Sequence, residues 1–495
     1  MATYSPDMNK YEDCLKKIGG AVAKLSTAEL EERNAKHRQA GAPALTKEEF
    51  LNTPHGKVLQ SLPPFTVRRM EGSVTPPVAF PAASASLLPS TPEDKPRQKQ
   101  ILEGIKVLEL CRVIAGPTIG RSLAALGASV LRINSPKLPD VTFFQVDANT
   151  GKHAAFLDLT DPDQRAAFDA LLQEADVVID GYRPGVLSKF GCEPQALAER
   201  AARRGKGYVY VVEDCFGGTG SVGRVSPKAA AGGSGSSERN SDGGDGGGDG
   251  DGDGDDAEWA HRPGWQQIAD CVSGVAWEQG RFMGLDEPVV PPFPMSDYGT
   301  GCLGSAAALV GLLRRARDGG SWACRTSLLQ YDLFLLSLGR HAPEVEAALR
   351  AAHDREFFEL RHHDSVDVVS AAALKSMRRL HPLLFDREVM MHSADSDGFQ
   401  MPPPQETATI GIGSEKGAVP EGSNGFGSSA ATAAAEGQSI AARNTNMKTT
   451  ATVTWPREAV EVEGWKIGHV RPSRANGNDE PEWGDWERDE ALFDA

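Results

Sequence analysis

Between residues 101 and 225, short apolar runs alternate with helical patterns, and this alternation restricts the possible folds more than any other feature. "IKVLEL" predicts a strand, "PTIGRSLAALG" a helix with Pro near its start and Gly at its end, and "SVLRI" a second strand. "AAFLDL", "DVVID" and "GYVYVV" predict further buried strands, with "TDPDQRAAFDALLQEA" as a helix opened by a Thr-x-x-Asp cap. Because parallel strands need such helical crossovers, we predict an α/β fold with a Rossmann-like open parallel sheet.

The stretches outside this alternation predict how the chain is organised. "STAELEERNAKHRQAG" begins at a Ser-x-x-Glu capping box and ends at a glycine, as helices commonly do. The Gly-, Ser- and Asp-rich residues 226–260 hold too little apolar area to offset the cost of ordering. We therefore expect a helical segment (1–75), a linker (76–100), an α/β domain (101–340) with a disordered acidic insertion (226–260), a helical segment (341–410), a low-complexity linker (411–446) and a C-terminal tail (447–495).

Composition argues against several classes of partner. The net charge of −16 comes in visible part from an acidic run at 242–258, and no basic stripe favours nucleic acid or an anionic membrane. Seven cysteines without a CxxC pair are typical of reduced thiols rather than of a disulfide framework or a zinc site. The sequence shows no leader pattern at its start and no run of about eighteen apolar residues. We expect a cytoplasmic chain, with a mitochondrial or peroxisomal location left open.

Two segments suggest metal ions but fit them poorly. The Gly and Asp residues at 245–256 lack both the EF-hand spacing and the apolar residue of β-helix repeats, so a solvated linker is favoured over a calcium site. In "RHHD" (361–364), neighbouring histidines on a helix would face apart, which favours a surface cluster over a metal site. We expect no bound metal.

Two other segments offer a choice between structure and chemistry. "CRVIAGPTIG" (111–120) lies at the carboxyl end of a predicted strand, where open α/β sheets bind ligands, but without a GxGxxG pattern ordinary packing is favoured. In "FPMSDYGTGCLGS", Asp297 is either the N-cap of a helix or a nucleophilic carboxylate. The helix end would keep that carboxylate ionised, and Gly299 and Gly301 would let a substrate approach the backbone. Spacing alone favours the cap.

Three segments together resemble the class III CoA-transferase family, whose members include formyl-CoA transferase, carnitine CoA-transferase and alpha-methylacyl-CoA racemase. They are "LEGIKVLELCRVIAGPTIGRSLAALGASVLRI", "ADVVIDGYRPGVLSKFG" and "SDYGTGCLGSAAALVGLLRRARDGGSW". The resemblance covers about residues 101–335 and implies a Rossmann-like large domain with a smaller domain. It also implies a homodimer, because two chains of this family interlock as linked rings.

The resemblance further implies an activity and a set of site residues. The nucleophilic aspartate of the family falls on Asp297, whose carboxylate would attack an acyl-CoA thioester to give a mixed anhydride and then an aspartyl-CoA thioester. A small carboxylic acid would collect the CoA, and amides at Gly299 and Gly301 would hold the oxyanion. Coenzyme A is then a substrate, with no permanently bound cofactor. Its contacts in the family map onto Ile114, Ala115, Leu157, Asp158, Leu159, Thr160, Gly181, Tyr182, Arg183 and Lys189, with Arg112 as a further phosphate partner.

Departures from the family pattern keep two alternatives open. Where racemases of the family have a histidine, this chain has Trp265, which disfavours a two-base racemase. The low-complexity sequence after residue 340 suggests a decayed small domain, as in a catalytically inactive binding or scaffold protein. Residues 1–75 resemble the segment that closes the small domain, as expected if this chain is the remainder of a longer or fused protein. The retained Asp297 favours the transferase.

Overall fold

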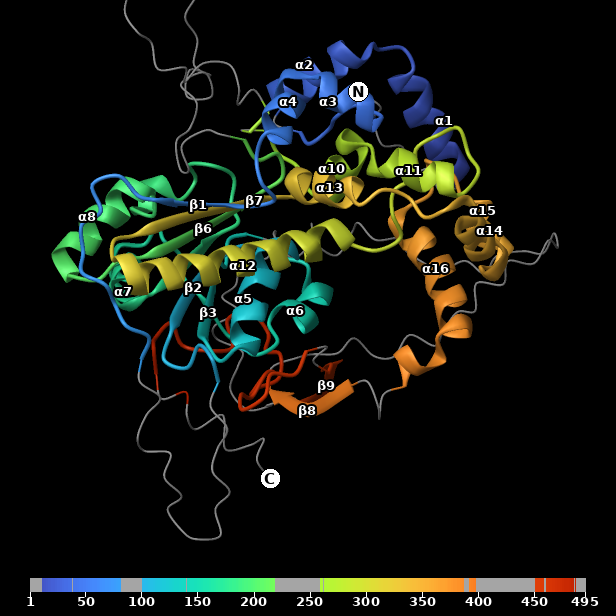
Figure 1. The fold of residues 1–495 in the computed structure, drawn as a ribbon. Coiled ribbons are helices and arrows are strands. Elements are labelled where there is room, and N and C mark those ends of the chain that lie inside the picture. Colours follow the sequence, from blue (N-terminus) through green and yellow to red (C-terminus); the bar gives the residue numbers. More distant parts are fainter. Residues whose placement is uncertain are drawn as a thin grey trace, which may run out of the picture.

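A seven-stranded sheet forms the centre of the protein, in the order β1-β7-β6-β5-β2-β3-β4 (Figure 1). The computed structural model describes residues 11–37, 39–81, 100–138, 140–218, 259–260, 262–386, 391–397, 450–457, 460–484 and 486. The strands of the sheet are β1 (Thr66–Arg69), β2 (Lys106–Leu110), β3 (Ser129–Asn134), β4 (His153–Phe156), β5 (Val177–Asp180), β6 (Val209–Asp214) and β7 (Trp322–Ser327). All neighbouring pairs are parallel except β1 with β7. The predicted Rossmann-like α/β sheet is therefore confirmed.

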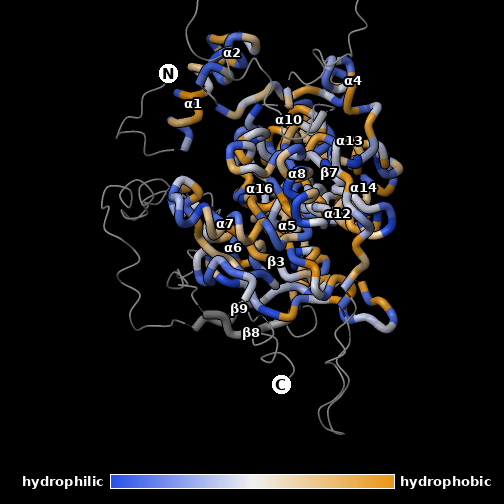
Figure 2. Tube along the Cα trace, turned by 90° about the vertical axis from the view of Figure 1, so that its left-hand side faces the viewer, coloured by the Kyte–Doolittle hydropathy of each residue, from blue (hydrophilic) through white to orange (hydrophobic). Residues whose placement is uncertain are grey.

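Helices cover both faces of this sheet. They are α5 (Ala115–Ala125), α6 (Thr142–Ala148), α7 (Pro162–Glu174), α8 (Pro194–Arg204) and α12 (Met295–Asp318). On one face Leu108 and Val178 pack against α7 and α8, and on the other Val107 and Val130 pack beneath α5 and α12. This follows from the pleat, because successive residues of a strand point to opposite faces. In Figure 2 the apolar stretches of α5 and β3 lie in the middle of the molecule.

Small residues let α12 lie very close to its neighbours. A Cβ atom added at Gly304 would lie 2.5 Å from Ile119 Cδ1 of α5, and one added at Gly311 would lie 2.7 Å from Val209 Cγ1 of β6. Real Cβ atoms do not approach other atoms this closely, so larger residues would force the helix away from the sheet. The glycine-spaced sequence of α12 is thus explained by packing.

A second layer of helices lies where β6 and β7 end (Figure 1). It consists of α3 (Lys47–Asn52), α4 (Pro54–Gln60), α10 (Gln266–Ser273), α11 (Val275–Phe282) and α13 (Leu328–Ser337). Phe216, which follows β6, and Leu328, which follows β7, pack there with Phe50 of α3 and Leu59 of α4. This layer places α10 beside the first turn of α12.

A C-terminal segment, residues 460–484 and 486, packs along the free edge of β4. The Asp479 side chain accepts a hydrogen bond from the backbone N–H of Ala154 at 2.7 Å. The Trp486 indole stacks on the His153 ring, with 3.9 Å between the ring centroids. A sheet edge covered in this way no longer presents unpaired backbone groups to other chains.

The remaining helices are α1 (Tyr11–Val22), α2 (Thr27–His37), α14 (Pro343–Ala352), α15 (Arg355–Phe358) and α16 (Val366–Leu380), with short 3₁₀ turns at Ser188–Phe190 and Pro382–Phe385. A separate antiparallel hairpin joins β8 (Met391–Asp397) to β9 (Thr450–Pro456). The capping box at Ser26 is confirmed, since its hydroxyl accepts from the Glu29 N–H at 3.3 Å. No helix in the described ranges combines the length and apolar character needed to cross a bilayer.

Several local predictions are wrong. Residues 66–69 form β1 rather than helix, because they pair with β7, and residues 391–397 form β8. The strand predicted from "AAFLDL" ends at Phe156. Helix α7 is capped not by Thr160 but by Asp161, which accepts from the N–H groups of the second and third residues of the helix. The predicted disordered insertion (226–260), except its last two residues, and the linker at 411–446 lie outside the described residues.

The close packing of α12 gives a test of this fold. A Cβ added at Gly301 would overlap the Thr118 side chain and lie 2.9 Å from the Ala115 carbonyl oxygen. We expect Gly301→Ala to lower the free energy of unfolding by about 1–3 kcal/mol, measured by urea denaturation. Gly20→Ala in α1 is the control, because nothing lies within 4 Å of its added Cβ. Equal stability of both variants would contradict the packing role.

Candidate active site

The turn between β2 and α5 lies at the carboxyl end of β2, an interior strand of the sheet. Val113 in this turn has a φ of 89°, a conformation that is rare for a β-branched residue and costs about 1–3 kcal/mol. Residues on the two sides of Val113 contact different regions of the protein. Arg112 lines a cavity, and the carbonyl oxygen of Ala115 lies against Gly301 of α12. The turn therefore connects the cavity to the helix that carries Asp297.

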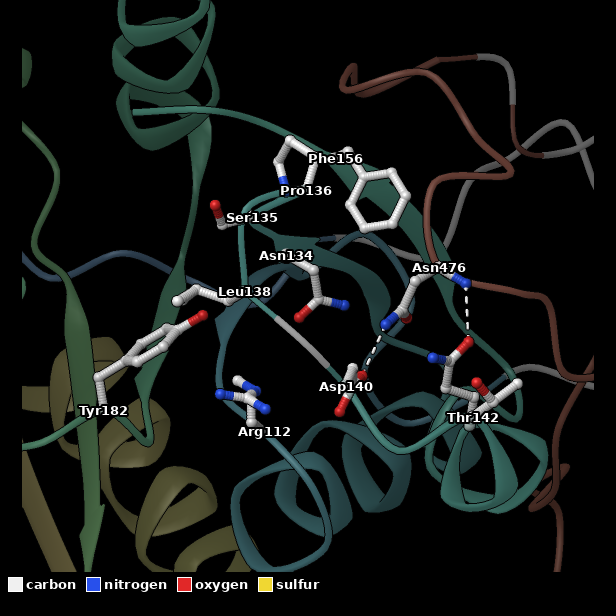
Figure 3. Close-up of a pocket in the computed structure, with 11 residues that line it drawn as sticks. Arg112, Asn134, Ser135, Pro136, Leu138, Asp140, Thr142, Phe156, Tyr182 and Asn476 are labelled. Carbon is white, nitrogen blue, oxygen red and sulfur yellow. Dashed lines mark hydrogen bonds between the residues drawn. The ribbon is translucent and has the colours of Figure 1, made fainter. Parts of the chain in front are cut away.

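The cavity has a volume of about 220 Å³ and opens where β2, β3 and β5 end (Figure 3). This is less than the roughly 300–1,000 Å³ of sites that enclose a whole drug-sized ligand. The lining residues are Arg112, Asn134, Ser135, Pro136, Leu138, Asp140, Thr142, Gln145, Phe156, Tyr182 and Asn476. The predicted ligand residues Arg112 and Tyr182 thus lie in one cavity.

Asn476 reaches this cavity from the C-terminal segment. Its side-chain amide donates to Asp140 Oδ2 at 2.7 Å, and its backbone N–H donates to Gln145 Oε1 at 3.1 Å (Figure 3). A third hydrogen bond comes from Asn149, whose amide donates to Asn476 Oδ1 at 3.0 Å. These hydrogen bonds fix one wall of the cavity to the last part of the chain.

A buried ion network lies beneath the cavity. Glu109 of β2 accepts from Lys152 Nζ at 2.6 Å, and its other oxygen lies 3.5 Å from Arg132 Nε of β3. All three side chains are almost wholly buried. Arg132 also contacts Asp140 at 3.3 Å, which holds that carboxylate at the cavity wall. Burial lowers the pKa of Lys152, although the negative charge of Glu109 opposes this shift.

Asp297 is the third residue of α12. The N-cap interpretation is wrong, because the cap position is Pro294 and no side chain caps this helix. The backbone N–H of Asp297 donates to the Gln266 side-chain oxygen at 3.1 Å, and the Gln266 amide donates in turn to the Phe293 carbonyl. Gln266 thus fixes the start of α12 against α10. The Asp297 residue remains partly exposed.

The charge state of Asp297 also differs from the expectation. Burial, together with the nearby carboxyl of Asp270, raises its pKa to about 7. A helix N-terminus favours a carboxylate, but here desolvation is the larger effect. Glu213 of β6 lies in the same region, and burial with repulsion from Asp297 raises its pKa well above the usual value. Asp297 is consequently close to half protonated at neutral pH.

Gly299 and Gly301 do not open the backbone to a substrate. A Cβ at Gly299 would overlap the Tyr331 ring, and the position of Gly301 is filled by Thr118 and Ala115. They are the fifth and seventh residues of α12, so their N–H groups belong to the helical ladder. The expectation that these amides hold an oxyanion is therefore wrong, because only the first four N–H groups of a helix are left over.

The other predicted residues are spread around the ends of the strands. Ile114 and Ala115 are buried at the start of α5, and Gly181 lies against Cys111, whose Cβ would be 2.5 Å from an added methyl group. Tyr182 donates its backbone N–H to Asp180 at 2.9 Å, and burial raises the pKa of the Asp180 carboxyl to about 7. Arg183 and Lys189 are exposed.

Residues 157–160 form the turn after β4. Leu157 is buried in the core, and Leu159 packs against it from the edge. Asp158 pairs with Lys137 at 2.5 Å and accepts from the Thr160 hydroxyl at 2.6 Å. These hydrogen bonds lower the pKa of Asp158 to about 2. A ligand at this turn would therefore contact the backbone, or the Asp158 and Thr160 side chains, which already have hydrogen-bond partners.

Sequence reasoning missed several residues of the site. These are Gln266, Glu213, Asp270, Asp332 and Asn476. The two acids "ED" at the end of the apolar run "YVYVVED" were a signal for Glu213, since charged residues at a strand's carboxyl end face a possible ligand. No local pattern identifies Asn476, which bonds to a residue 336 positions away. Trp265, at the position of the racemase histidine, is 54% exposed at the start of α10 and offers no basic group.

Comparison with known proteins supplies further information. The sequence pattern of CoA-transferase family III matches residues 102–233 and 249–356. An acetyl-coenzyme A transferase of Hypoxylon pulicicidum is 33% identical over 72% of this chain and 52% of its own length. An acyl-CoA transferase of Gibberella moniliformis is 30% identical over 76% of this chain and 58% of its own length. The chain thus spans little more than half the length of these relatives.

Solved structures give a weaker match. A hypothetical protein from Mycobacterium tuberculosis is 22% identical over 52% of this chain and 61% of its own, with a TM-score of 0.35. A CAIB/BAIF family protein from Brucella suis is 24% identical over 49% of this chain and 56% of its own, with the same TM-score of 0.35.

The raised pKa of Asp297 predicts a pH-dependent stability. The folded chain keeps a proton on this carboxyl up to about pH 7, whereas the unfolded chain loses it near its ordinary value of 3.8. The carboxyl therefore destabilises the fold increasingly as the pH rises from about 4 to 7. We expect Asp297→Asn to match the wild type near pH 4 and to be about 2–4 kcal/mol more stable at pH 8, by urea unfolding.

Asp318→Asn is the control for this measurement. Asp318 lies at the other end of α12, is paired with Arg317, and has a lowered pKa. This variant removes the same charge but gains no stability at high pH. A stability difference between Asp297→Asn and the wild type that does not change with pH would contradict the raised pKa.

Proposed function

The chain belongs to CoA-transferase family III, and we propose that it moves coenzyme A from an acyl-CoA donor to a carboxylic acid acceptor through covalent intermediates on Asp297. The observation that carries this proposal is the setting of Asp297. Its carboxyl is partly exposed, has its pKa raised to about 7, and lies in the first turn of α12 beside the β2–α5 turn. A carboxylate with a raised pKa is a better nucleophile than an ordinary one.

The proposed reaction has four acyl transfers. An Asp297 oxygen attacks the thioester carbonyl, the C–S bond breaks, and a mixed anhydride and the CoA thiolate form. The thiolate attacks the aspartyl carbonyl, which releases the donor acid and leaves an aspartyl-CoA thioester. The acceptor carboxylate attacks this thioester, the C–S bond breaks, and a second anhydride and the CoA thiolate form. The thiolate then attacks the acceptor's carbonyl, which frees the new acyl-CoA and restores Asp297. Together the four acyl transfers replace one difficult step, the direct exchange of CoA between two carboxylic acids.

We propose that the cavity at Arg112 and Tyr182 holds the nucleotide end of CoA. The guanidinium suits a phosphate and the phenol ring suits stacking on adenine. With a volume of about 220 Å³ the cavity would take one end of coenzyme A and not the whole molecule. The pantetheine arm would then follow the β2–α5 turn, whose Ala115 lies against α12 one helical turn from Asp297. The homodimer expected from the family stays a prediction.

Replacement of the nucleophile tests the reaction. We expect Asp297→Asn to lower CoA transfer at least about 1,000-fold, because no anhydride forms on an amide. Hydroxylamine added to the wild type during turnover converts the activated Asp297 to a hydroxamate, which peptide mass spectrometry detects. Asp318→Asn on the same helix is the control and keeps full activity. If a broad panel of acyl-CoA donors leaves Asp297 unmodified, the chain is not a transferase and the non-catalytic binding protein is favoured.

A second prediction concerns the cavity. We expect Arg112→Met and Tyr182→Leu each to raise the Kd for CoA about tenfold, measured by calorimetry, because each removes one interaction with the nucleotide. Arg355→Met is the control, since the Arg355 side chain is 92% exposed in α15. Unchanged affinity in both cavity variants would contradict the assignment of the nucleotide end.

A further inference from the structure

Two carboxyl groups are buried beside the start of α12. Asp270 of α10 and Asp332 of α13 are both fully buried. The Ser296 hydroxyl donates to Asp270 Oδ1 at 2.7 Å, and the Ser273 hydroxyl donates to Asp332 Oδ2 at 2.9 Å. The remaining carboxyl oxygens, Asp270 Oδ2 and Asp332 Oδ1, have no hydrogen-bond partner among the described residues. Ser296 lies directly before Asp297.

No basic side chain among the described residues neutralises these carboxyls. In the part of the chain that the structure describes, no Lys, Arg or His side chain pairs with Asp270 or Asp332. The ionisable groups that face them from neighbouring elements are Cys271 of α10, Asp297 of α12, Tyr331 of α13 and, after β6, Cys215. Beyond Cys215 lie Glu213, which is itself buried, and Asp214, which Arg325 neutralises at 2.7 Å. All the groups facing the pair are neutral or acidic.

Two buried carboxyls without a counter-ion cannot both be charged, because each charge is costly in a dry environment and the two repel. The pair therefore keeps at least one proton, since burial raises the pKa of Asp332 well above its usual value and that of Asp270 to about 7. Ser296, in hydrogen-bond contact with both groups, can donate to the charged one and accept from the protonated one. As the pH rises through about 7 Asp270 ionises while Asp332 keeps its proton, so the pair then holds one negative charge beside Ser296.

We propose that Asp270 and Asp332 share one proton and act as positioning residues, whose single negative charge next to Ser296 makes the Asp297 carboxylate more basic and more reactive. This inference rests on the proposed function of Asp297. When Asp297 attacks a thioester it becomes an uncharged anhydride, so the repulsion from the pair is relieved as the reaction proceeds. The pair thus destabilises the charged Asp297 carboxylate relative to the uncharged anhydride, which favours acylation.

The test measures the protonation of Asp297 directly. Carbodiimide modifies protonated carboxyls, and peptide mass spectrometry follows its reaction at Asp297 against pH. We expect the double variant Asp270→Asn, Asp332→Asn to shift the midpoint to lower pH by about one unit, because the repelling charge is gone. Each single variant shifts it less, because the remaining carboxyl keeps the charge. The acidic limb of kcat/KM for CoA transfer moves in the same direction.

Two further variants complete the experiment. Ser296→Ala removes the hydrogen bond that stabilises the charged pair, so its midpoint also falls, by a smaller amount; this variant decides the question if the double variant does not fold. Asp318→Asn, about 30 Å away along α12, leaves the midpoint unchanged. A wild-type midpoint in the double variant, or in Ser296→Ala when the double variant does not fold, overturns the inference. Labelling needs no CoA chemistry, so a chain without transferase activity still gives a readable midpoint.

Discussion

The site depends on one buried carboxylate, Glu109. It lies between Lys152, whose ammonium also donates to the Pro117 carbonyl at 2.7 Å, and Arg132. These buried contacts join β2, β3, the residue before β4 and the first turn of α5. Removing one partner of such a group would leave an uncompensated buried charge, which costs about 3–5 kcal/mol. The network therefore fixes the geometry of the turn that carries Arg112 and, through Arg132, the position of Asp140.

The start of α12 is held to the same framework from the other side. The Tyr298 hydroxyl donates to Asp147 of α6 at 2.8 Å, and Arg121 of α5 contacts the same carboxylate at 3.3 Å. Helix α6 also supplies Gln145 to the cavity. The residue after Asp297 and the wall of the cavity are thus attached to one short helix. The separation of the cavity from Asp297 is therefore set by helices packed on the sheet rather than by loops.

The sequence predicted the central sheet well, because its signals are local. Apolar runs separated by helical patterns specify parallel strands whatever else the chain contains. The edge strand β1 could not be found in this way, since its pairing with β7 joins residues far apart in the chain, such as Thr66 and Arg325. The same holds for the site. The position of Asp297 was readable from its motif, but its charge state depends on desolvation and on Asp270, which only the packing of α10 against α12 reveals.

The hydrogen bond between Asn476 and Asp140 determines when the cavity wall can form during synthesis. Asp140 and Asn476 are 336 residues apart, so at a synthesis rate of about 5–20 residues per second the cavity wall arrives roughly 20–70 seconds after Asp140 leaves the ribosome. The strands up to β7 (Trp322–Ser327) are all made before the end of that interval, and Asn476 follows them. The cavity wall at Asn476 is therefore completed only after every strand of the sheet has been made.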